Sequence, residues 1–321
     1  MTALWRAPWL RALVALLTVA VLAWLLRHVD WAAWWARLRT LPGWLWAVVP
    51  LGMGLSYLAR AARVHAELSL RQPVSLWHCL RLSLVHNLAI HVVPMRGGEL
   101  AYPALLQREL GVPLGSAMAS LAWMRLQDAL MLLAAVVLLA PLPWPGRIAL
   151  LGVAGLGLVA GVRWARGHAQ ALIQRAADAP EPSGWRGRLG KAWRTGLQAL
   201  TDPSRHTGAG WLYCAGNWAL KLLVIGSVLA ALSATPLATA LRGALGGELA
   251  ALSPLQGPSG LGTYEAGVWL GMRAVPQADA ASTAAVALAA LTAHALVFLT
   301  ALVAGLLAML ASARARRAAA S

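Results

Sequence analysis

Charged side chains are scarce in this sequence of 321 residues. Only 12% of the residues are charged, 60% are hydrophobic, and the mean hydropathy is +0.64. A soluble domain has roughly twice that share of charged residues. The composition therefore excludes an ordinary soluble protein and predicts a polytopic membrane protein.

Acidic residues and cysteines are the rarest of the reactive types. Eleven Asp and Glu stand against 27 Lys and Arg, which gives a formal net charge of +16. In a membrane protein such an excess usually lies in cytoplasmic loops, so we expect no nucleic-acid partner. Cys79 and Cys214 lie far apart in apolar stretches. We interpret both as packing residues rather than as disulfide or zinc ligands.

Motifs for nucleotide binding or nucleophilic catalysis are also missing. The sequence has no Walker loop and no G-x-S-x-G, and the glycines of GPSGLG (257–262) do not follow a strand. His86 and His91 are five residues apart, which is a poor spacing for metal ligands on a helix. We expect no cofactor, no metal and no catalytic residues, and we favour a transporter over an enzyme.

Long apolar runs are what the sequence has in abundance. Runs of membrane-spanning length occupy residues 8–27, 43–60, 113–140, 146–165, 209–232 and 278–311. Two further runs end in Pro- and Gly-rich stretches and are followed by shorter apolar helices; the pairs are 75–93 with 98–110, and 236–253 with 263–275. The Trp-rich residues 31–39 and the polar residues 166–207 are typical of amphipathic helices at the membrane surface.

The two interrupted runs are predicted to turn back inside the membrane as re-entrant hairpins. With both hairpins re-entrant, the following basic residues lie on one side: Arg6, Arg11, Arg60, Arg63, Arg71, Arg108, the eight Lys and Arg between 163 and 205, and Arg314, Arg316 and Arg317. The other side keeps only Arg27, Arg37, Arg39, Arg147 and Arg273. The positive-inside rule therefore predicts an all-α protein with six spans, two hairpins, a loop at 60–74 and both termini in the cytoplasm.

This order of elements repeats within the chain. Residues 1–140 and 141–312 each contain two spans, a hairpin and a span, and 313–321 form a basic tail. Glu99 and Asp128 are 29 residues apart, as are Glu265 and His294. Because three spans separate equivalent points, we expect an inverted repeat, an architecture of transporters whose site lies near the midplane.

Charged residues inside the apolar segments are the candidate site. Each costs about 2.5–3.5 kcal/mol at a helix centre, so it must pair, line a wet cavity or bind a charged molecule. They are Arg81, Arg96, Arg125, Lys221 and Arg242, against Glu99, Asp128, Glu248 and Glu265. Arg125 and Asp128 are spaced to form a salt bridge, for neutralisation or to orient the arginine. Lys221 either pairs with Glu248 or Glu265 or meets an anion.

The hairpin tips supply further candidates. The sequence predicts tight turns there, built from Pro94, Gly97, Gly98, Pro258, Gly260 and Gly262. Glu99 and Glu265 follow in the first helical turn, where a carboxylate caps the helix or contacts a ligand. Backbone N–H groups at these helix starts, together with Arg96, suit a phosphate. Asn87 and His91 share one face of the preceding helix.

Two of these stretches resemble the lysylphosphatidylglycerol synthase transmembrane-domain family. NLAIHVVPMRGGELAYPALL and MRLQDALMLL match its Asn, Pro-x-Arg-x-Gly-Glu and Arg-x-x-Asp pattern, and SPLQGPSGLGTYEAG matches its second signature, Gly-x-x-Glu. The sequence departs from the family at Ser259, where glycine is common, and at His294, where arginine is expected. The resemblance implies re-entrant helices and flippase-like function, here in a stand-alone member without the aminoacyl transferase domain.

We therefore expect a lipid flippase of the bacterial inner membrane. Its partners would be phosphate-bearing membrane lipids, either a phospholipid or a polyprenyl-phosphate-linked lipid, and a homo-oligomer remains open. Two alternatives stay open as well: an intramembrane enzyme that modifies lipid headgroups, and a transporter of small solutes or ions.

Overall fold

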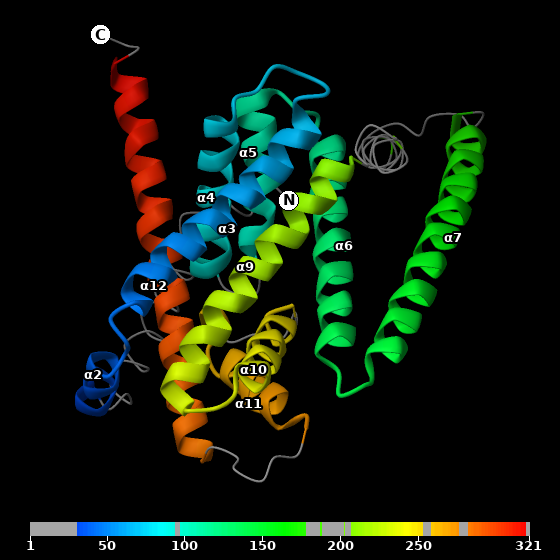
Figure 1. Ribbon diagram of the computed structural model, residues 1–321. Coiled ribbons are helices and arrows are strands. Elements are labelled where there is room, and N and C mark those ends of the chain that lie inside the picture. The colour runs from blue at the N-terminus through cyan, green and yellow to red at the C-terminus, as the bar shows by residue number, and fades with distance from the viewer. Residues whose placement is uncertain are drawn as a thin grey trace. The chain divides into compact units, whose positions relative to one another are not determined.

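The computed structural model describes residues 31–93, 97–177, 207–252, 258–275 and 282–318, with the isolated positions 187 and 202 (Figure 1). All regular secondary structure in these ranges is helical. The all-α prediction is therefore confirmed.

Within the described ranges, five helices are long and apolar enough to cross a membrane. They are α3 (Leu45–Leu68), α6 (Leu114–Leu139), the first part of α7 (Trp144–Ala177), α9 (Gly208–Ser233) and most of α12 (Thr283–Ala318). These helices match five of the six predicted spans, and the sixth, at 8–27, lies outside the described residues. The Trp-rich segment is also helical, as α2 (Trp31–Arg39).

Three of these helices extend well beyond their predicted ends: α3, α7, and α12, which continues past 311 to Ala318. α3 continues to Leu68, so the loop predicted at 60–74 was wrong for its first half, and Arg63 is buried at 4% exposure. The reason is that LARAARVHAEL contains no Gly or Pro and is rich in strong helix formers. α7 likewise continues to Ala177, into the predicted surface segment 166–207.

Both interrupted runs form the predicted pairs of broken helices. In the first, α4 (Leu76–Val92) is followed by a 3₁₀ turn (Gly97–Leu100) and α5 (Ala101–Leu110). In the second, α10 (Leu237–Ala250) is followed by a 3₁₀ turn (Pro258–Gly260) and α11 (Thr263–Arg273). The chain between the halves, including Pro94 and Arg96 in the first pair, lies outside the described residues.

The helices of the second pair pack backbone against backbone. A Cβ atom added at Gly246 would lie 2.2 Å from the carbonyl oxygen of Gly267, and one at Gly267 would lie 2.4 Å from that of Gly246. Gly271 meets the backbone of Arg242 in the same way. Only glycine permits this approach, and close packing of small residues is how helices associate in membranes.

The chain folds into two compact units, each with segments from both predicted halves. Of the described residues, the first contains those within 31–57, 83–99 and 219–318, and the second contains those within 58–82 and 100–218. A cluster from α3, α4, α5 and α6 forms the core of the second unit, with Leu82, Tyr102 and Leu106 nearly inaccessible. Cys79 belongs to that core, and both Cys79 and Cys214 are buried free thiols.

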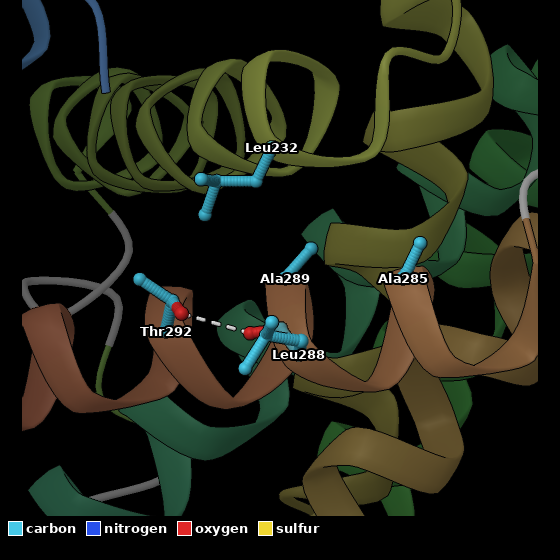
Figure 2. A pocket seen from close by; sticks show the side chains of 5 residues that line it. All are labelled: Leu232, Ala285, Leu288, Ala289 and Thr292. Atoms are coloured by element: carbon cyan, nitrogen blue, oxygen red, sulfur yellow. Dashed lines mark hydrogen bonds between the residues drawn. The ribbon is translucent and has the colours of Figure 1, made fainter. Parts of the chain in front are cut away.

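In the first unit, α9 and α12 meet across small side chains (Figure 2). Leu232 of α9 points toward Ala289 and Thr292 of α12. Thr292 donates its hydroxyl to the Leu288 carbonyl of its own helix, at 2.8 Å. The narrow pocket between these residues has no room for a water molecule, so it is a packing feature rather than a binding site.

Candidate functional site

The second hairpin tip is held against α12 by one carboxylate and one histidine. Glu265 accepts a hydrogen bond from the backbone N–H of Gly262 at 2.6 Å, which confirms its predicted capping position. The other Glu265 oxygen lies 2.7 Å from Nδ1 of His294, and Nε2 of His294 lies 3.1 Å from the carbonyl oxygen of Ser259. The tip turns through positive φ at Ser259 (56°), Gly260 and Gly262.

The two helix breaks meet within the first unit. Ser259 donates its hydroxyl to the backbone carbonyl of His91, at 2.8 Å, in the last turn of α4. The His91 ring packs edge-on against Phe298 of α12, with ring centroids 6.0 Å apart. A cavity of about 120 Å³ adjoins this junction and is lined by Ser259, Leu261, Leu291, His294, Ala295 and Phe298. The second break therefore contacts the end of α4, directly before the first break, and both contact α12.

The first hairpin tip also places a carboxylate beside a histidine. Glu99 Oε2 lies 3.8 Å from Nε2 of the buried His86. Gly98 lies directly on α4, because a Cβ atom there would be 2.0 Å from the carbonyl oxygen of Ala89. Asn87 of the same helix is also buried.

A second ion pair of the first unit joins α9 to α10. Lys221 of α9 donates to Glu248 of α10 at 2.6 Å, so Lys221 takes the first of its two predicted alternatives. Tyr264 is buried and stacks on the His294 ring, with the ring centroids 4.5 Å apart. Its hydroxyl has no hydrogen-bond partner in the described part of the chain. Arg242 donates to Thr239 of its own helix.

In the second unit, Asp128 is the centre of a buried charge cluster. It accepts hydrogen bonds from Arg63 at 2.7 Å, from Arg125 at 3.0 Å and from the Trp218 indole at 3.1 Å. The predicted Arg125–Asp128 bridge is therefore confirmed. The more buried partner is Arg63, which also donates to the Met124 carbonyl at 2.9 Å and which sequence reasoning had placed in a loop. The signal that could have found it is the helix-forming run that continues past residue 60.

Two carboxylates of the second unit that sequence reasoning did not select, Glu67 and Glu109, hold polar groups near the first hairpin. Arg81 pairs with Glu109, which connects α4 to α5 within the first hairpin. Ser120 donates to the buried Glu67 at 2.8 Å. The hydroxyl of Tyr102 lies 3.1 Å from that of Ser120 and is its donor, because the Ser120 proton is already directed to Glu67. Glu67 and Glu109 thus neutralise or satisfy buried polar groups near the hairpin.

The structure divides the predicted site residues between the two units. The first unit holds Asn87, His91, Gly97, Gly98, Glu99, Lys221, Arg242, Pro258, Gly260, Gly262, Glu265 and His294, and the second holds Arg81, Arg125 and Asp128. In the described residues, no three His, Cys, Asp or Glu side chains are grouped as a metal site.

The family of the chain follows from a comparison with known families. The model described as the lysylphosphatidylglycerol synthase TM region matches residues 9–305. The chain belongs to this family. The resemblance drawn from the two signatures is therefore confirmed, and the family together with the apolar helices makes this a multi-pass membrane protein. No curated protein and no solved structure matches the chain significantly.

The charge cluster of the second unit predicts which variants of Arg63, Arg125 and Asp128 lose most thermal stability. Asp128→Leu leaves the buried Arg63 guanidinium without its carboxylate, and an uncompensated buried charge costs about 3–5 kcal/mol. We expect a large fall in the thermal unfolding temperature in detergent. Arg63→Met combined with Asp128→Leu removes both buried charges and should unfold at a higher temperature than Asp128→Leu alone.

Arg125→Met is the matched control, because the Arg125 side chain is 26% exposed and its loss leaves the Arg63–Asp128 bond in place. It should cost much less than Asp128→Leu. Equal losses for the two single variants, or no recovery in the double variant, would contradict the assignment of Arg63 as the main partner.

The contacts and backbone conformation of Ser259 predict that its alanine and glycine variants differ in thermal stability. Ser259→Ala removes the hydrogen bond to His91, worth about 1 kcal/mol, and keeps a Cβ atom in the left-handed region. Ser259→Gly removes the same bond but relieves about 1 kcal/mol of backbone strain. Thermal unfolding should therefore place the alanine variant below the wild type and the glycine variant close to it. An alanine variant as stable as the wild type would show that the bond contributes nothing.

Proposed function

We propose that this protein is a lipid flippase, which moves a phosphate-bearing lipid between the leaflets of a bacterial inner membrane. The lipid is a phospholipid or a polyprenyl-phosphate-linked lipid, and both chain termini lie in the cytoplasm. The observation that carries the proposal is the meeting of two helix breaks at Ser259 and His91.

Broken helices are a costly feature that transporters use at their binding sites. Inside a bilayer, irregular backbone survives only where it is buried in protein or lines a cavity. In transporter folds, the freed N-terminal ends of half-helices point toward anionic groups of the substrate. Here the second halves of both broken helices begin with 3₁₀ turns at Gly97 and Pro258. Arg96 immediately precedes the first of these helix starts in the chain.

The lining of the junction supports an amphiphilic substrate. Four of the six residues around the cavity are apolar: Leu261, Leu291, Ala295 and Phe298. The remaining two, Ser259 and His294, direct their polar atoms into the tip contacts, so the wall of the cavity is apolar. A lipid offers both chemistries, because its phosphate matches helix N-termini and arginine while its chains match the apolar wall. A small polar solute would use only part of such a site.

Lipid exchange in proteoliposomes tests this proposal. Liposomes that carry a phospholipid with a dithionite-sensitive fluorophore lose only their outer-leaflet signal when no protein is present. With the wild-type protein, we expect the inner-leaflet signal to be lost as well. Arg96→Lys should lose much of this activity, because lysine lacks the paired donors of a guanidinium, and Arg96→Ala should lose more while remaining folded.

Gly54→Ala is the control variant, since a Cβ atom at this exposed helical position would meet nothing within 4 Å. It should exchange lipid as the wild type does. Absence of exchange by the wild type with every phosphate-bearing lipid would overturn the flippase assignment. Normal exchange by Arg96→Ala would overturn the phosphate role of the first tip.

A further inference from the structure

The two contacts of His294 fix how many protons the tip holds. A backbone carbonyl only accepts hydrogen bonds, so Nε2 of His294 must carry the proton in its contact with Ser259. The 2.7 Å contact between Nδ1 and Glu265 also needs a proton between the two atoms. Either a doubly protonated His294 donates to an ionised Glu265, or a protonated Glu265 donates to a neutral His294. Both forms hold one proton more than a neutral histidine beside a carboxylate.

We propose that the Glu265–His294 pair is a proton-binding site, and that the protein couples the uptake and release of this proton to the movement of its substrate. The inference rests on the proposed transport function and names its coupling ion. The step is a simple transfer: a proton moves from water to the pair and later returns from the pair to water on the other side of the membrane. No covalent bond to carbon or phosphorus is formed or broken.

Release of the proton forces a change at the hairpin tip. A neutral histidine has one N–H group, so it can donate to Glu265 or to the Ser259 carbonyl, but not to both. One of the two contacts that hold the tip on α12 is therefore lost. Ser259 is also the residue that donates to His91 of the first hairpin. The proton thus controls the place where the two helix breaks meet.

The surroundings of the pair limit how it exchanges a proton. His294 is 5% exposed, and the cavity of about 120 Å³ that it borders has an apolar wall, so a proton reaches the pair when one of its two hydrogen bonds opens. Of the neighbouring titratable groups, Tyr264 stacks on the His294 ring, and Glu248 directly follows Gly247, which packs against the Tyr264 ring. His91 of α4 packs against Phe298, and its backbone carbonyl accepts the hydrogen bond from Ser259. Lys221 of α9 neutralises Glu248. Glu248 therefore adds little net negative charge next to the pair.

The other ion pairs of the first unit do not have this property. In Lys221–Glu248 an ammonium meets a carboxylate, so the charged forms satisfy each other without a shared proton. His86 and Glu99 are 3.8 Å apart, which is too long for a proton-sharing hydrogen bond. The geometry therefore assigns the proton to the second tip.

Glu265→Gln is the informative variant. Its amide oxygen can accept from the Gly262 N–H, and its amide N–H can donate to Nδ1 of a neutral His294. The variant thereby reproduces the proton-loaded geometry with a hydrogen that does not exchange as an acid. Protonation of His294 is then opposed, because it would direct Nδ1–H against the amide N–H.

The first measurement needs no transport. In ¹⁵N-histidine spectra of the wild-type protein in nanodiscs, recorded over a pH series, the ring signal of His294 should change its protonation state. That signal should be missing in His294→Gln and should stay in the neutral form throughout in Glu265→Gln. His86→Gln is the control and should leave it unchanged. If no His294 signal titrates, or if it titrates equally in Glu265→Gln, the proton site is overturned.

The second measurement compares lipid exchange with and without a pH gradient across the proteoliposome membrane. The wild-type protein should respond to the gradient, and in Glu265→Gln the ratio of the two rates should fall to unity whatever the basal rate. Exchange that ignores the gradient in the wild type overturns the coupling, while the flippase assignment stands. Titration of His294 in a protein that exchanges no lipid would leave the proton site standing and overturn the flippase assignment.

Discussion

The backbone groups freed at the two helix breaks are the constraint on which the first unit depends. Water is not available in the core of a bilayer to satisfy them, so side chains must do so. Ser259 donates to the His91 carbonyl, His294 to the Ser259 carbonyl, Thr263 to the Gly260 carbonyl at 2.8 Å, and Glu265 accepts from Gly262. The side chains selected for chemistry are thus also the ones that make the break possible.

Pairing of the buried cations narrows the choice of substrate contacts. Arg81, Arg125 and Lys221 all carry carboxylate partners within their own units. Their predicted attraction for phosphate is therefore offset, because a paired charge offers much less field to a ligand than a free one. A phosphate would therefore depend most on two other arginines of the candidate site. Arg242 donates to Thr239, and Arg96 precedes the first tip in the chain.

Local signals predicted most of the fold. Run length gave the spans, the Pro/Gly stretches gave the breaks, and one-turn spacing gave the Arg125–Asp128 bridge and the Glu265 cap, because each depends only on residues close in sequence. The contacts that were missed join distant residues: Arg63 lies 65 positions from Asp128, and Arg81 lies 28 from Glu109. Such pairs depend on how each helix is rotated about its axis, and hydropathy does not determine that rotation.

The repeat illustrates the same limit. The 29-residue spacing joined Glu265 to His294 in a real contact, whereas Glu99 lies beside His86 and Asp128 beside Arg63. The same 29-residue spacing in the two halves therefore corresponds to a direct contact only in the second half. At His294, where the resemblance led us to expect arginine, the carboxylate of the second tip has a partner that, unlike arginine, also exists in a neutral form.

A density map of the protein in nanodiscs of anionic phospholipid tests the central claim most directly, because it shows both breaks and any bound lipid at once. We predict that the Ser259 hydroxyl contacts the His91 carbonyl and that a lipid phosphate lies at this junction, next to Arg96. A map in which the two breaks are far apart, or in which the junction is closed by protein and lipid headgroups bind elsewhere, would contradict it.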